Sequence, residues 1–461
     1  MATIINTVLG QHRGHKRLWL EGQKLVREGY AVGTPYSVEF KTDRMVITAH
    51  EADDKTGQYR VSRRRRNGHT SPIIDIEARE MATLFDGIEK LRVAIHAGRI
   101  VVTAHHQQQR VNQRIDRLVN RLSSHKPLSV CSLFHGGGVL DKAIHHGMMR
   151  VGVKTRIGVA VEMEPKYLDA SLRNNPELWD EASVAIESRI QDVALGKSPP
   201  PVDILVGGIP CTGASKSGRS KNKLAFAESH SEAGAMFFQF LQFVQVLNPS
   251  VVIIENVPEY QNTASMVVIR SVLDTLGYDI QECILEGNAF GVLERRKRLC
   301  AVALSKGMKG FVLDRVMPVK NKEAHMADIL DPVTLDSSRW KAFDYLAAKQ
   351  ERDAAAGKGF TRQLLTGAEE GCGTIGKGYA KCRSTEPFIV HPQDPGKSRI
   401  LTPAEHCRVK GIPASVTDGL SETTAHEILG QSVIYPAFEA VAASLGQFLQ
   451  GLTKTAVPLA A

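Results

Sequence analysis

The chain has few cysteines, and their spacing excludes two kinds of structural cross-link. Seven cysteines are scattered singly through 461 residues, with no Cys-x-x-Cys pair and an odd total. This usage argues against a disulfide framework and against a structural zinc site, so we expect no bound metal. It favours a reducing, cytoplasmic setting.

Long apolar runs are also absent from the sequence. No stretch approaches the ~20 apolar residues of a membrane-spanning helix, and residues 1–19 lack the apolar core of a signal peptide. We therefore expect no membrane partner. The hydrophobic content of 43% and the charged content of 23% are ordinary for globular proteins. The length suits two or three domains.

Positive charge is concentrated in the first quarter of the chain. Residues 1–126 contain 22 Lys and Arg against 13 Asp and Glu, whereas the remainder contains 36 of each. The whole excess of +9 therefore lies in this segment. Such asymmetry indicates a polyanionic partner, most simply nucleic acid. A basic surface that is only solvated is the alternative.

Short strands of alternating polarity predict a β-rich α+β module at residues 1–104. The clearest strands, several of them separated by Gly-containing turns, lie at 36–40, 45–48, 72–76 and 100–103. A weak internal repeat is also present. Residues 33–50 and 88–105 are both expected to form a strand, a turn and a strand, and both end in Thr-Ala-His.

Residues 105–126 are expected to form a basic amphipathic linker, with a helix over 105–123. Apolar residues at helical spacing form one face, and a second stripe is basic: Arg110, Arg114, Arg117 and Arg121. This stripe suits a helix that contacts DNA or dimerises, and it equally suits a connector packed on the next domain. The polar segment 123–127 marks the expected domain boundary.

From Leu128 onward, apolar strands alternate with helical stretches, which predicts a parallel α/β sheet. The first strand ends in the glycine-rich turn 135–138, which places a ligand near a helix N-terminus. The turn does not have the Gly-x-Gly-x-x-Gly pattern typical of NAD-binding folds, and no Gly-Lys-Ser/Thr follows it as in a P-loop. The strand at 157–161 ends in Glu162, whose carboxylate suits a ribose diol. A nucleoside-type cofactor without a pyrophosphate requirement is implied.

Two further strands bring a thiol and a carboxylate together. The apolar runs 202–206 and 251–254 are typical of buried parallel strands, and they are followed by Pro210-Cys211 and by Glu255. Because ligands bind beyond the carboxyl ends of such strands, the two side chains are expected to converge there. A nucleophile beside a proton-handling acid is an arrangement for covalent catalysis.

Taken in order, these motifs resemble those of the cytosine-C5 DNA methyltransferases over about residues 128–450. The matching motifs are Phe134-x-Gly136-x-Gly138, Glu162, Asp192, Pro210-Cys211, Glu255-Asn256-Val257, Arg296-x-Arg298, Arg399 to Pro413 and Gly430-Gln431-Ser432-Val433. An unmatched insert lies where that family keeps its target-recognition domain. The resemblance implies an α/β, Rossmann-like S-adenosylmethionine-dependent methyltransferase domain with an inserted small recognition domain, following the N-terminal β-rich α+β module.

The same resemblance implies domain limits. Residues 127–304 would hold the catalytic and cofactor-binding part, and residues 305–397 the target-recognition domain. Residues 398–461 would return to complete the methyltransferase domain.

It also implies roles for individual residues. Cys211 would attack C6 of a flipped-out cytosine, and Glu255 would hydrogen-bond the base at N3 and the exocyclic amine. Arg298 would contact the base O2, with Arg296 supporting its loop. The residues expected to bind S-adenosylmethionine are Phe134, Gly136, Gly138, Glu162, Asp192, Pro210, Gln431 and Ser432.

Candidate DNA contacts lie in two segments. The small, polar and basic stretch after Cys211 suits a loop that closes over the nucleotide, with Ser215, Lys216 and Arg219 toward the DNA. In the insert, Thr374-Ile375 resembles the Thr-aliphatic pair of the family's recognition domain, within a glycine-rich segment.

Four residues, in three motifs, depart from the family's pattern. Thr212 stands where Gln usually follows Pro-Cys, Leu293-Glu294 replaces Pro-Gln, and Gln431 replaces Asn. None removes a group that the chemistry needs. They put the rate, the loop packing and the shape of the cofactor pocket in question.

The N-terminal region carries a shorter resemblance. Residues 18–25 and the first copy of the repeat resemble SymE-type members of the AbrB-like swapped-hairpin families. Those families imply a small β-rich dimer that binds DNA, with Arg63 to Arg66 here contacting phosphates. A homodimer through this module is therefore one expectation.

The resulting prediction is a bacterial or phage-type DNA (cytosine-5)-methyltransferase, of the restriction-modification or orphan type, that acts on double-stranded DNA with S-adenosylmethionine. It would be cytoplasmic and associated with the nucleoid. A tRNA cytosine-C5 methyltransferase and a catalytically idle DNA-binding regulator are the alternatives. The sequence identifies no cognate restriction endonuclease.

Overall fold

The computed structural model describes residues 2–51, 57–66, 69–196, 199–210, 234–358 and 360–455. The chain divides into two compact units, an N-terminal unit of residues 1–113 and a C-terminal unit of residues 114–461. Each unit has its own hydrophobic core.

Before α3 (His106–Ser123), the described residues of the N-terminal unit form two antiparallel sheets and two short helices, α1 (Gln23–Arg27) and α2 (Glu80–Leu84). The larger sheet has the order β1-β9-β10-β5-β4-β6, and the smaller has the order β2-β3-β8-β7. The strands are β1 (Thr3–Val8), β2 (Gly10–His12), β3 (His15–Glu21), β4 (Pro35–Phe40), β5 (Met45–Ala49), β6 (Tyr59–Arg60), β7 (Ser62–Arg66), β8 (His69–Glu77), β9 (Lys90–His96) and β10 (Arg99–Ala104). The two copies of the sequence repeat are the hairpins β4–β5 and β9–β10.

A seven-stranded sheet forms the centre of the C-terminal unit, in the order β13-β12-β11-β14-β15-β17-β16. The strands are β11 (Leu128–Leu133), β12 (Thr155–Glu162), β13 (Val184–Glu187), β14 (Ile204–Gly208), β15 (Val251–Asn256), β16 (Tyr278–Glu286) and β17 (Lys297–Ser305). β17 is antiparallel to both of its neighbours, and the pairs from β13 to β15 are parallel. The strand order reverses between β11 and β14, and ligands bind at such a point.

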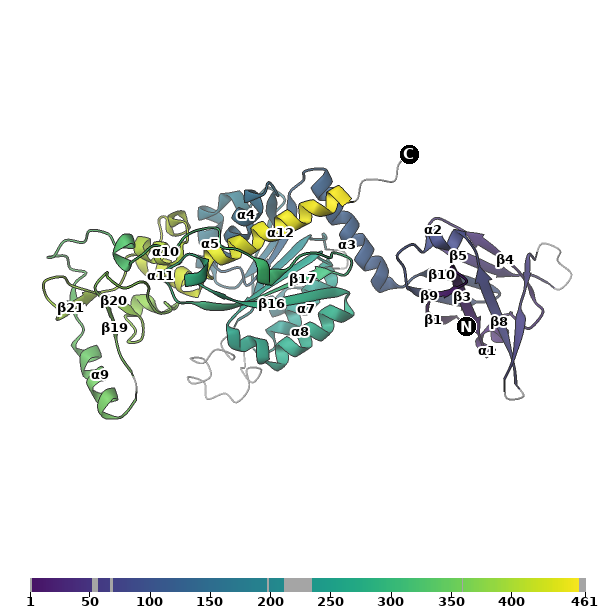
Figure 1. The fold of residues 1–461 in the computed structure, drawn as a ribbon, viewed down its shortest axis with the longest axis horizontal. Helices are drawn as coiled ribbons and strands as arrows, with labels where there is room; N and C mark the ends of the chain where they lie inside the picture. Colours follow the sequence, from purple (N-terminus) through teal and green to yellow (C-terminus); the bar gives the residue numbers. More distant parts are fainter. Residues whose placement is uncertain are drawn as a thin grey trace. The chain divides into compact units, whose positions relative to one another are not determined.

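The central strands β11, β14 and β15 are buried on both faces because helices cover both faces of the sheet. Alternate residues of β15 belong to two different cores: Val251 and Ile253 pack on one side, and Val252 and Ile254 on the other. On the first side α4 (Val139–Arg150) packs against α12 (Tyr435–Thr455), which brings the C-terminal part of the chain back to the sheet (Figure 1). The second side is covered by α7 (Met236–Leu247) and α8 (Ala264–Thr275).

The long helix α3 (His106–Ser123) leads into this unit, and its basic stripe is largely used in packing. The Arg114 side chain is buried, and its guanidinium lies 3.6 Å from the centre of the Tyr278 ring. Arg117 and Arg121 both pair with the buried Asp203, each at 3.1 Å. For these three arginines the structure agrees with the connector interpretation rather than with a DNA-contacting stripe.

Between β17 and α10 (Pro403–Lys410) the chain forms a small four-stranded sheet of order β18-β21-β20-β19. Its elements are β18 (Lys341–Ala342), α9 (Asp344–Ala355), β19 (Gln363–Leu365), β20 (Pro387–Val390) and β21 (Lys397–Arg399). Its core includes Leu293, which precedes β17, and Val409 of α10. The remaining long helices of the unit are α5 (Pro165–Asn174) and α11 (Glu422–Gln431).

No single helix in the described ranges is both long and apolar enough to cross a membrane. The pair α11 and α12 reaches that length and composition only when taken together, across a bend of 50°.

Candidate active site

The glycine-rich turn after β11 has a left-handed backbone at three alternating positions. Phe134 has φ 59°, Gly136 58° and Gly138 73°. Gly138 also precedes the first residue of α4, and a Cβ at this position would lie 2.4 Å from the Ser171 hydroxyl oxygen. Glycine is therefore required here both by the backbone angle and by space. The turn leads directly into a helix N-terminus, where backbone N–H groups are available to a ligand.

A buried polar network holds this turn. The His135 ring contacts the Ser132 hydroxyl at 2.9 Å through Nδ1 and the Ser171 hydroxyl at 2.7 Å through Nε2. Ser132 also donates to Asp141 at 2.8 Å, and the Asn175 amide donates to the Gly137 carbonyl oxygen at 3.1 Å. Since these groups are buried and joined to one another, they fix the turn before any ligand binds.

Two acids stand beyond the ends of the neighbouring strands. Glu162, the last residue of β12, accepts a hydrogen bond from the Gly136 backbone N–H at 2.7 Å and others from Met163 and Glu164. Asp192 lies in a short 3₁₀ helix (Ile190–Asp192) after β13 and is exposed. A fixed carboxylate beside the turn and an exposed one further along suit the hydroxyl and amine donors of a nucleoside.

The end of α11 lies against the same turn. A Cβ at Gly136 would lie 3.6 Å from the Gln431 amide nitrogen, so this longer replacement of the usual Asn still reaches the site. Ser432 is buried, and its hydroxyl donates to the Leu429 carbonyl oxygen at 2.5 Å. In this structure that hydroxyl caps α11.

The register of β14 and β15 places the expected catalytic segments together. Gly208 lies directly opposite Glu255, and a Cβ at Gly208 would lie 3.4 Å from the Glu255 carboxylate. The Asn256 amide donates to the Ile209 carbonyl oxygen at 3.0 Å, and its own oxygen accepts from the Val257 N–H. Asn256 therefore ties the end of β15 to the residue before Pro210.

Glu255 and Arg298 form the charged centre of the site. Arg298 Nε lies 2.8 Å from Glu255 Oε1, and each side chain is 14% exposed. Arg298 is on β17, the strand that pairs with β15 on the side away from β14. Both groups therefore retain a polar edge that a ligand can reach.

Arg296 lies apart from this pair and is almost fully buried. It donates to the carbonyl oxygens of Ile375 and Gly430, each at 3.4 Å. Its contacts thus join the loop before β17 to the insert and to the end of α11, which suits a supporting role.

Glu294 is at the centre of that junction. Its carboxylate accepts from the Ile375 N–H at 2.7 Å and pairs with Lys410 at 2.8 Å. Both members of the pair are buried, with side-chain exposures of 1% and 0%. Burial would raise the pKa of Glu294, but Lys410 and Arg296 outweigh it and hold that pKa below its ordinary value. Burial lowers the pKa of Lys410 to about 7, although Glu294 opposes the shift.

The two candidate recognition residues of the insert differ in exposure. Thr374 is exposed, and its hydroxyl donates to the Arg295 carbonyl oxygen at 3.3 Å. The Ile375 side chain is fully buried in the core of the insert. A DNA contact at this pair would therefore come from Thr374 or from the backbone.

Comparison with known proteins decides the family. The family model described as C-5 cytosine-specific DNA methylase matches residues 128–447. The chain belongs to this family. The match contains the glycine-rich turn, both acids beyond the strand ends, the Glu255–Arg298 pair and the end of α11.

Bacterial type II methyltransferases are among the relatives that match this chain. The chain is 27% identical over 260 residues to M1.ScrFI of Lactococcus lactis and 28% identical over 258 residues to M.SsoII of Shigella sonnei. These matches cover 55% and 53% of this chain and 64% of each relative, so the shared segment spans just under two thirds of their length.

Solved structures confirm the methyltransferase fold. The Dnmt2 methyltransferase of S. pombe matches with a TM-score of 0.53 and 16% identity, over 71% of this chain and 99% of the other. The Entamoeba histolytica methyltransferase EhMeth matches with the same TM-score and 19% identity, over 70% and 98%.

Several of the expected site residues lie outside the described residues. They are Cys211, Thr212, Ser215, Lys216 and Arg219. Pro210, immediately before them, is described and half-buried.

Lys410 was not among the residues expected from the sequence. It lies within the matched stretch from Arg399 to Pro413 but far from Glu294 in the chain, and nothing in that stretch marks it as the partner of an acid. The unusual acid at position 294 was the one signal that could have led to it. The methyltransferase signature alone did not reveal this buried ion pair.

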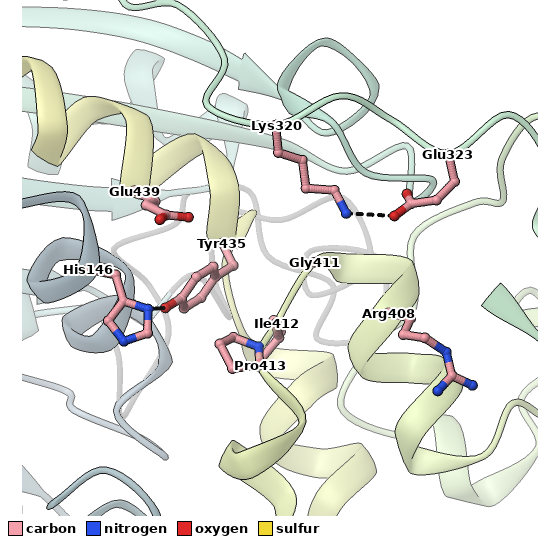
Figure 2. A pocket seen from close by; sticks show the side chains of 9 residues that line it. All are labelled: His146, Lys320, Glu323, Arg408, Gly411, Ile412, Pro413, Tyr435 and Glu439. Atoms are coloured by element: carbon pink, nitrogen blue, oxygen red, sulfur yellow. Dashed lines mark hydrogen bonds and ion pairs between the residues drawn. The ribbon is translucent and has the colours of Figure 1, made fainter. Parts of the chain in front are cut away.

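A separate open cavity of about 330 Å³ lies between α4, α10, the start of α12 and the segment around Lys320 (Figure 2). Its polar side chains already contact one another or neighbours: Tyr435 with His146 at 2.6 Å, and Lys320 with Glu323 at 2.6 Å. None of the expected catalytic or cofactor residues lines it.

Proposed function

We propose that the protein is a DNA (cytosine-5)-methyltransferase that methylates cytosine within a defined double-stranded sequence, using S-adenosylmethionine. The observation that supports this most directly is the Glu255–Arg298 pair, held beside the strand that leads into Pro210-Cys211. It lies within a family match covering the described cofactor turn. We expect the enzyme in the cytoplasm, associated with the nucleoid.

The described residues fit S-adenosylmethionine. The left-handed turn Phe134–Gly138 leaves backbone open at a helix N-terminus, and Glu162 stands at its edge. Glu162 would hold the ribose hydroxyls, Asp192 the adenine amine, and Gln431 would border the turn. When bound, the cofactor supplies an electrophilic methyl group.

The chain's own residues would perform the remaining chemistry. The Cys211 thiolate adds to C6 of an extruded cytosine, forming an S–C6 bond, and the electrons of the C5=C6 bond make C5 nucleophilic. Glu255 hydrogen-bonds N3 and the exocyclic amine, and Arg298 contacts O2, so that the charge developing in the ring is stabilised. After methylation, loss of the C5 proton re-forms the C5=C6 bond and expels the thiolate.

Arg296 and Glu294 position other groups of the site and do not themselves touch the base. Arg296 donates to the backbone of Ile375 in the insert and of Gly430 near the end of α11. It therefore holds the segment that carries Arg298 against the part of the fold that borders the cofactor turn. It is a positioning residue rather than one that touches the base.

The test is bisulfite sequencing of DNA from cells that express the wild-type chain or the Cys211→Ala variant. We expect protected cytosines in one fixed sequence context with the wild type only. Protection confined to tRNA would favour the tRNA methyltransferase instead. A chain that binds DNA without protecting any cytosine would favour the idle regulator.

A further inference from the structure

The two halves of the N-terminal unit are related by a two-fold arrangement in the strand register. At matching places in the repeat, Met45 corresponds to Ile100, Val46 to Val101 and Ile47 to Val102. In the β5–β10 ladder, Val46 lies opposite its own counterpart Val101, Met45 opposite Val102, and Ile47 opposite Ile100. Exchanging the two halves therefore leaves the pairing unchanged, so a local two-fold axis passes between Val46 and Val101.

The same relation holds in the second sheet. Continuing the correspondence, Leu18 matches Ile73 and Glu21 matches Ile76. In the β3–β8 ladder Leu18 lies opposite Ile76, and Glu21 opposite Ile73. These two pairs are images of each other. One axis thus relates both central ladders.

The outer strands are exchanged between the halves. β1, from the first half, pairs with β9 of the second, and β6, from the second half, pairs with β4 of the first. The backbone N–H of Leu9 donates to Glu89 at 2.7 Å, and that of Val61 donates to Thr34 at 3.0 Å. Glu89 and Thr34 occupy the same place in the two copies. Each half completes the sheet of the other, as a second copy of the chain would in a dimer.

The hairpin β7–β8 carries exposed arginines in a row along one strand. Arg63 and Arg65 are exposed on one face of β7, opposite Pro72 and Thr70. Within the described part of the chain, neither side chain forms a hydrogen bond or an ion pair with another residue. Arg64, on the other face, contacts Glu21 at 3.2 Å.

In the corresponding hairpin β2–β3, the cations on β3 are used internally, and Arg13 in the turn is exposed. Arg17 makes a bidentate contact with Asp75, at 2.7 and 2.6 Å, and Lys16 donates to the Phe85 carbonyl oxygen. The two-fold arrangement is therefore structural, whereas the row of exposed arginines lies along β7 and has no counterpart along β2. Guanidinium groups in a row suit the phosphates of a nucleic-acid backbone.

We propose that the N-terminal unit is a complete two-fold unit within one chain, and that its β7–β8 hairpin binds the phosphate backbone of duplex DNA. The strand edges that a second copy would cover are already paired within the chain, so the unit needs no homodimer. Phosphate contacts of this kind add affinity without reading sequence. The choice of duplex DNA rests on the proposed function, whereas the two-fold arrangement does not.

The hairpin is tested in the full-length protein with the double variant Arg63→Gln/Arg65→Gln. The matched control is Arg79→Gln/Arg99→Gln, which removes the same charge from exposed positions of this unit outside the hairpin. Affinity for a non-target duplex is measured by fluorescence anisotropy at several salt concentrations. The slope of log K against log salt is negative, and we expect it to become shallower by about 2 in the hairpin variant. The slope of the control should remain that of the wild type.

An unchanged slope in the hairpin variant, or an equal change in the control, would overturn the contact. So would tighter binding of the wild type to tRNA than to duplex DNA, with the hairpin variant losing that preference. Binding is measured without methyl transfer. A chain that shows the expected slopes but protects no cytosine would refute the proposed function and leave the hairpin contact standing.

The intrachain arrangement is tested by mild oxidation of the Val46→Cys/Val101→Cys variant, with wild type and each single variant in parallel. We expect a disulfide within one chain, seen as a monomer on a non-reducing gel and as a linked peptide pair by mass spectrometry. A covalent dimer specific to the double variant would show that a second copy supplies the partner strand. Absence of both products would refute the pairing of Val46 with Val101.

Discussion

At the scale of single residues, Glu255 is restrained on three sides. Gly208 faces it from β14, Cys300 lies opposite it on β17, and Arg298 binds its carboxylate at 2.8 Å. A larger residue at position 208 would crowd the carboxylate, since even a Cβ would reach 3.4 Å. The carboxylate is thus oriented before substrate arrives, which is the condition for efficient stabilisation of developing charge.

The variant Glu255→Gln keeps the shape of this side chain and removes its charge. We expect kcat for methyl transfer to fall by about 10²–10³, the loss typical of removing one such stabilising group. DNA affinity should change little because the backbone contacts are unaffected. The measurement is transfer of a labelled methyl group at saturating duplex, with gel-shift affinity alongside. A fall in affinity with kcat retained would assign Glu255 to binding instead.

The pair Glu294–Lys410 explains why an acid is tolerated where the family usually has Gln. Lys410 is fully buried and pairs with one oxygen of the Glu294 carboxylate, and the Ile375 N–H donates to the other oxygen. Lys410→Met would leave the carboxylate buried without its cation, and we expect it to lower the free energy of unfolding by about 3–5 kcal/mol. Glu294→Gln/Lys410→Met should recover most of that loss, since Gln can still accept from Ile375.

Urea unfolding of the wild type, both single variants and the double variant forms the cycle that tests this coupling. Additive effects of the two substitutions would show that the pair contributes no specific stability. If the pair also aligns the segment that leads from Glu294 to Arg298, the double variant should show a lower kcat at a stability close to that of the wild type.

At the scale of elements, local sequence patterns predicted the strands of the sheet well and the contacts between distant segments poorly. The β-branched runs at 157–161 and 251–254 lie within β12 and β15, and the glycine-rich turn lies where expected. Such signals are local, because a buried parallel strand needs apolar side chains on both faces. The contact of Arg296 with Ile375 and Gly430 joins three distant segments, and no periodicity encodes it.

A second long-range contact has a consequence for pH dependence. His406 of α10 and His426 of α11 are both fully buried, with their Nδ1 atoms 2.9 Å apart, and both rings lie against Tyr379 of the insert. Burial lowers the pKa of His426 to about 4 and holds the pKa of His406 well below its usual value. Both imidazoles are therefore neutral in the folded protein at pH 5–7.

In the unfolded chain both histidines bind protons as the pH falls below about 6.5. The unfolded state then holds more protons than the folded state, so the free energy of unfolding decreases as the pH is lowered from about 6.5 to 4. We expect the C-terminal unit to lose about 2 kcal/mol between pH 6 and pH 5. Urea unfolding at a series of pH values measures this loss.

The variant His406→Gln/His426→Gln should flatten that pH dependence, whatever its stability at pH 7. The exposed His125, replaced by Asn, serves as the control and should leave the slope as in the wild type. An equally steep loss in the double variant would assign the acid sensitivity to other groups.

At the scale of the whole molecule, the division between the two units falls inside one helix. The N-terminal unit ends at Gln113, while Arg114 already belongs to the C-terminal unit. Arg114 donates to the Ser305 hydroxyl at 2.7 Å, and Arg117 donates to the carbonyl oxygens of Val202 and Asn248 at 2.6 and 2.7 Å. The second half of α3 is thus part of the methyltransferase core, although its sequence resembles that of a linker.

Two truncations separate these roles. Removal of residues 1–105 keeps α3 intact, and we expect the remaining chain to fold, bind S-adenosylmethionine and retain methyl transfer, with weaker DNA binding of smaller salt dependence. Removal of residues 1–126 also takes away Arg114 and both cationic partners of the buried Asp203. Because an unpaired buried charge is costly, we expect this shorter chain to be less stable by several kcal/mol or to aggregate. Thermal unfolding with and without S-adenosylmethionine compares the two. Equal stability of the two truncations would show that α3 is only a tether, and instability of both would show that the methyltransferase core depends on the N-terminal unit itself.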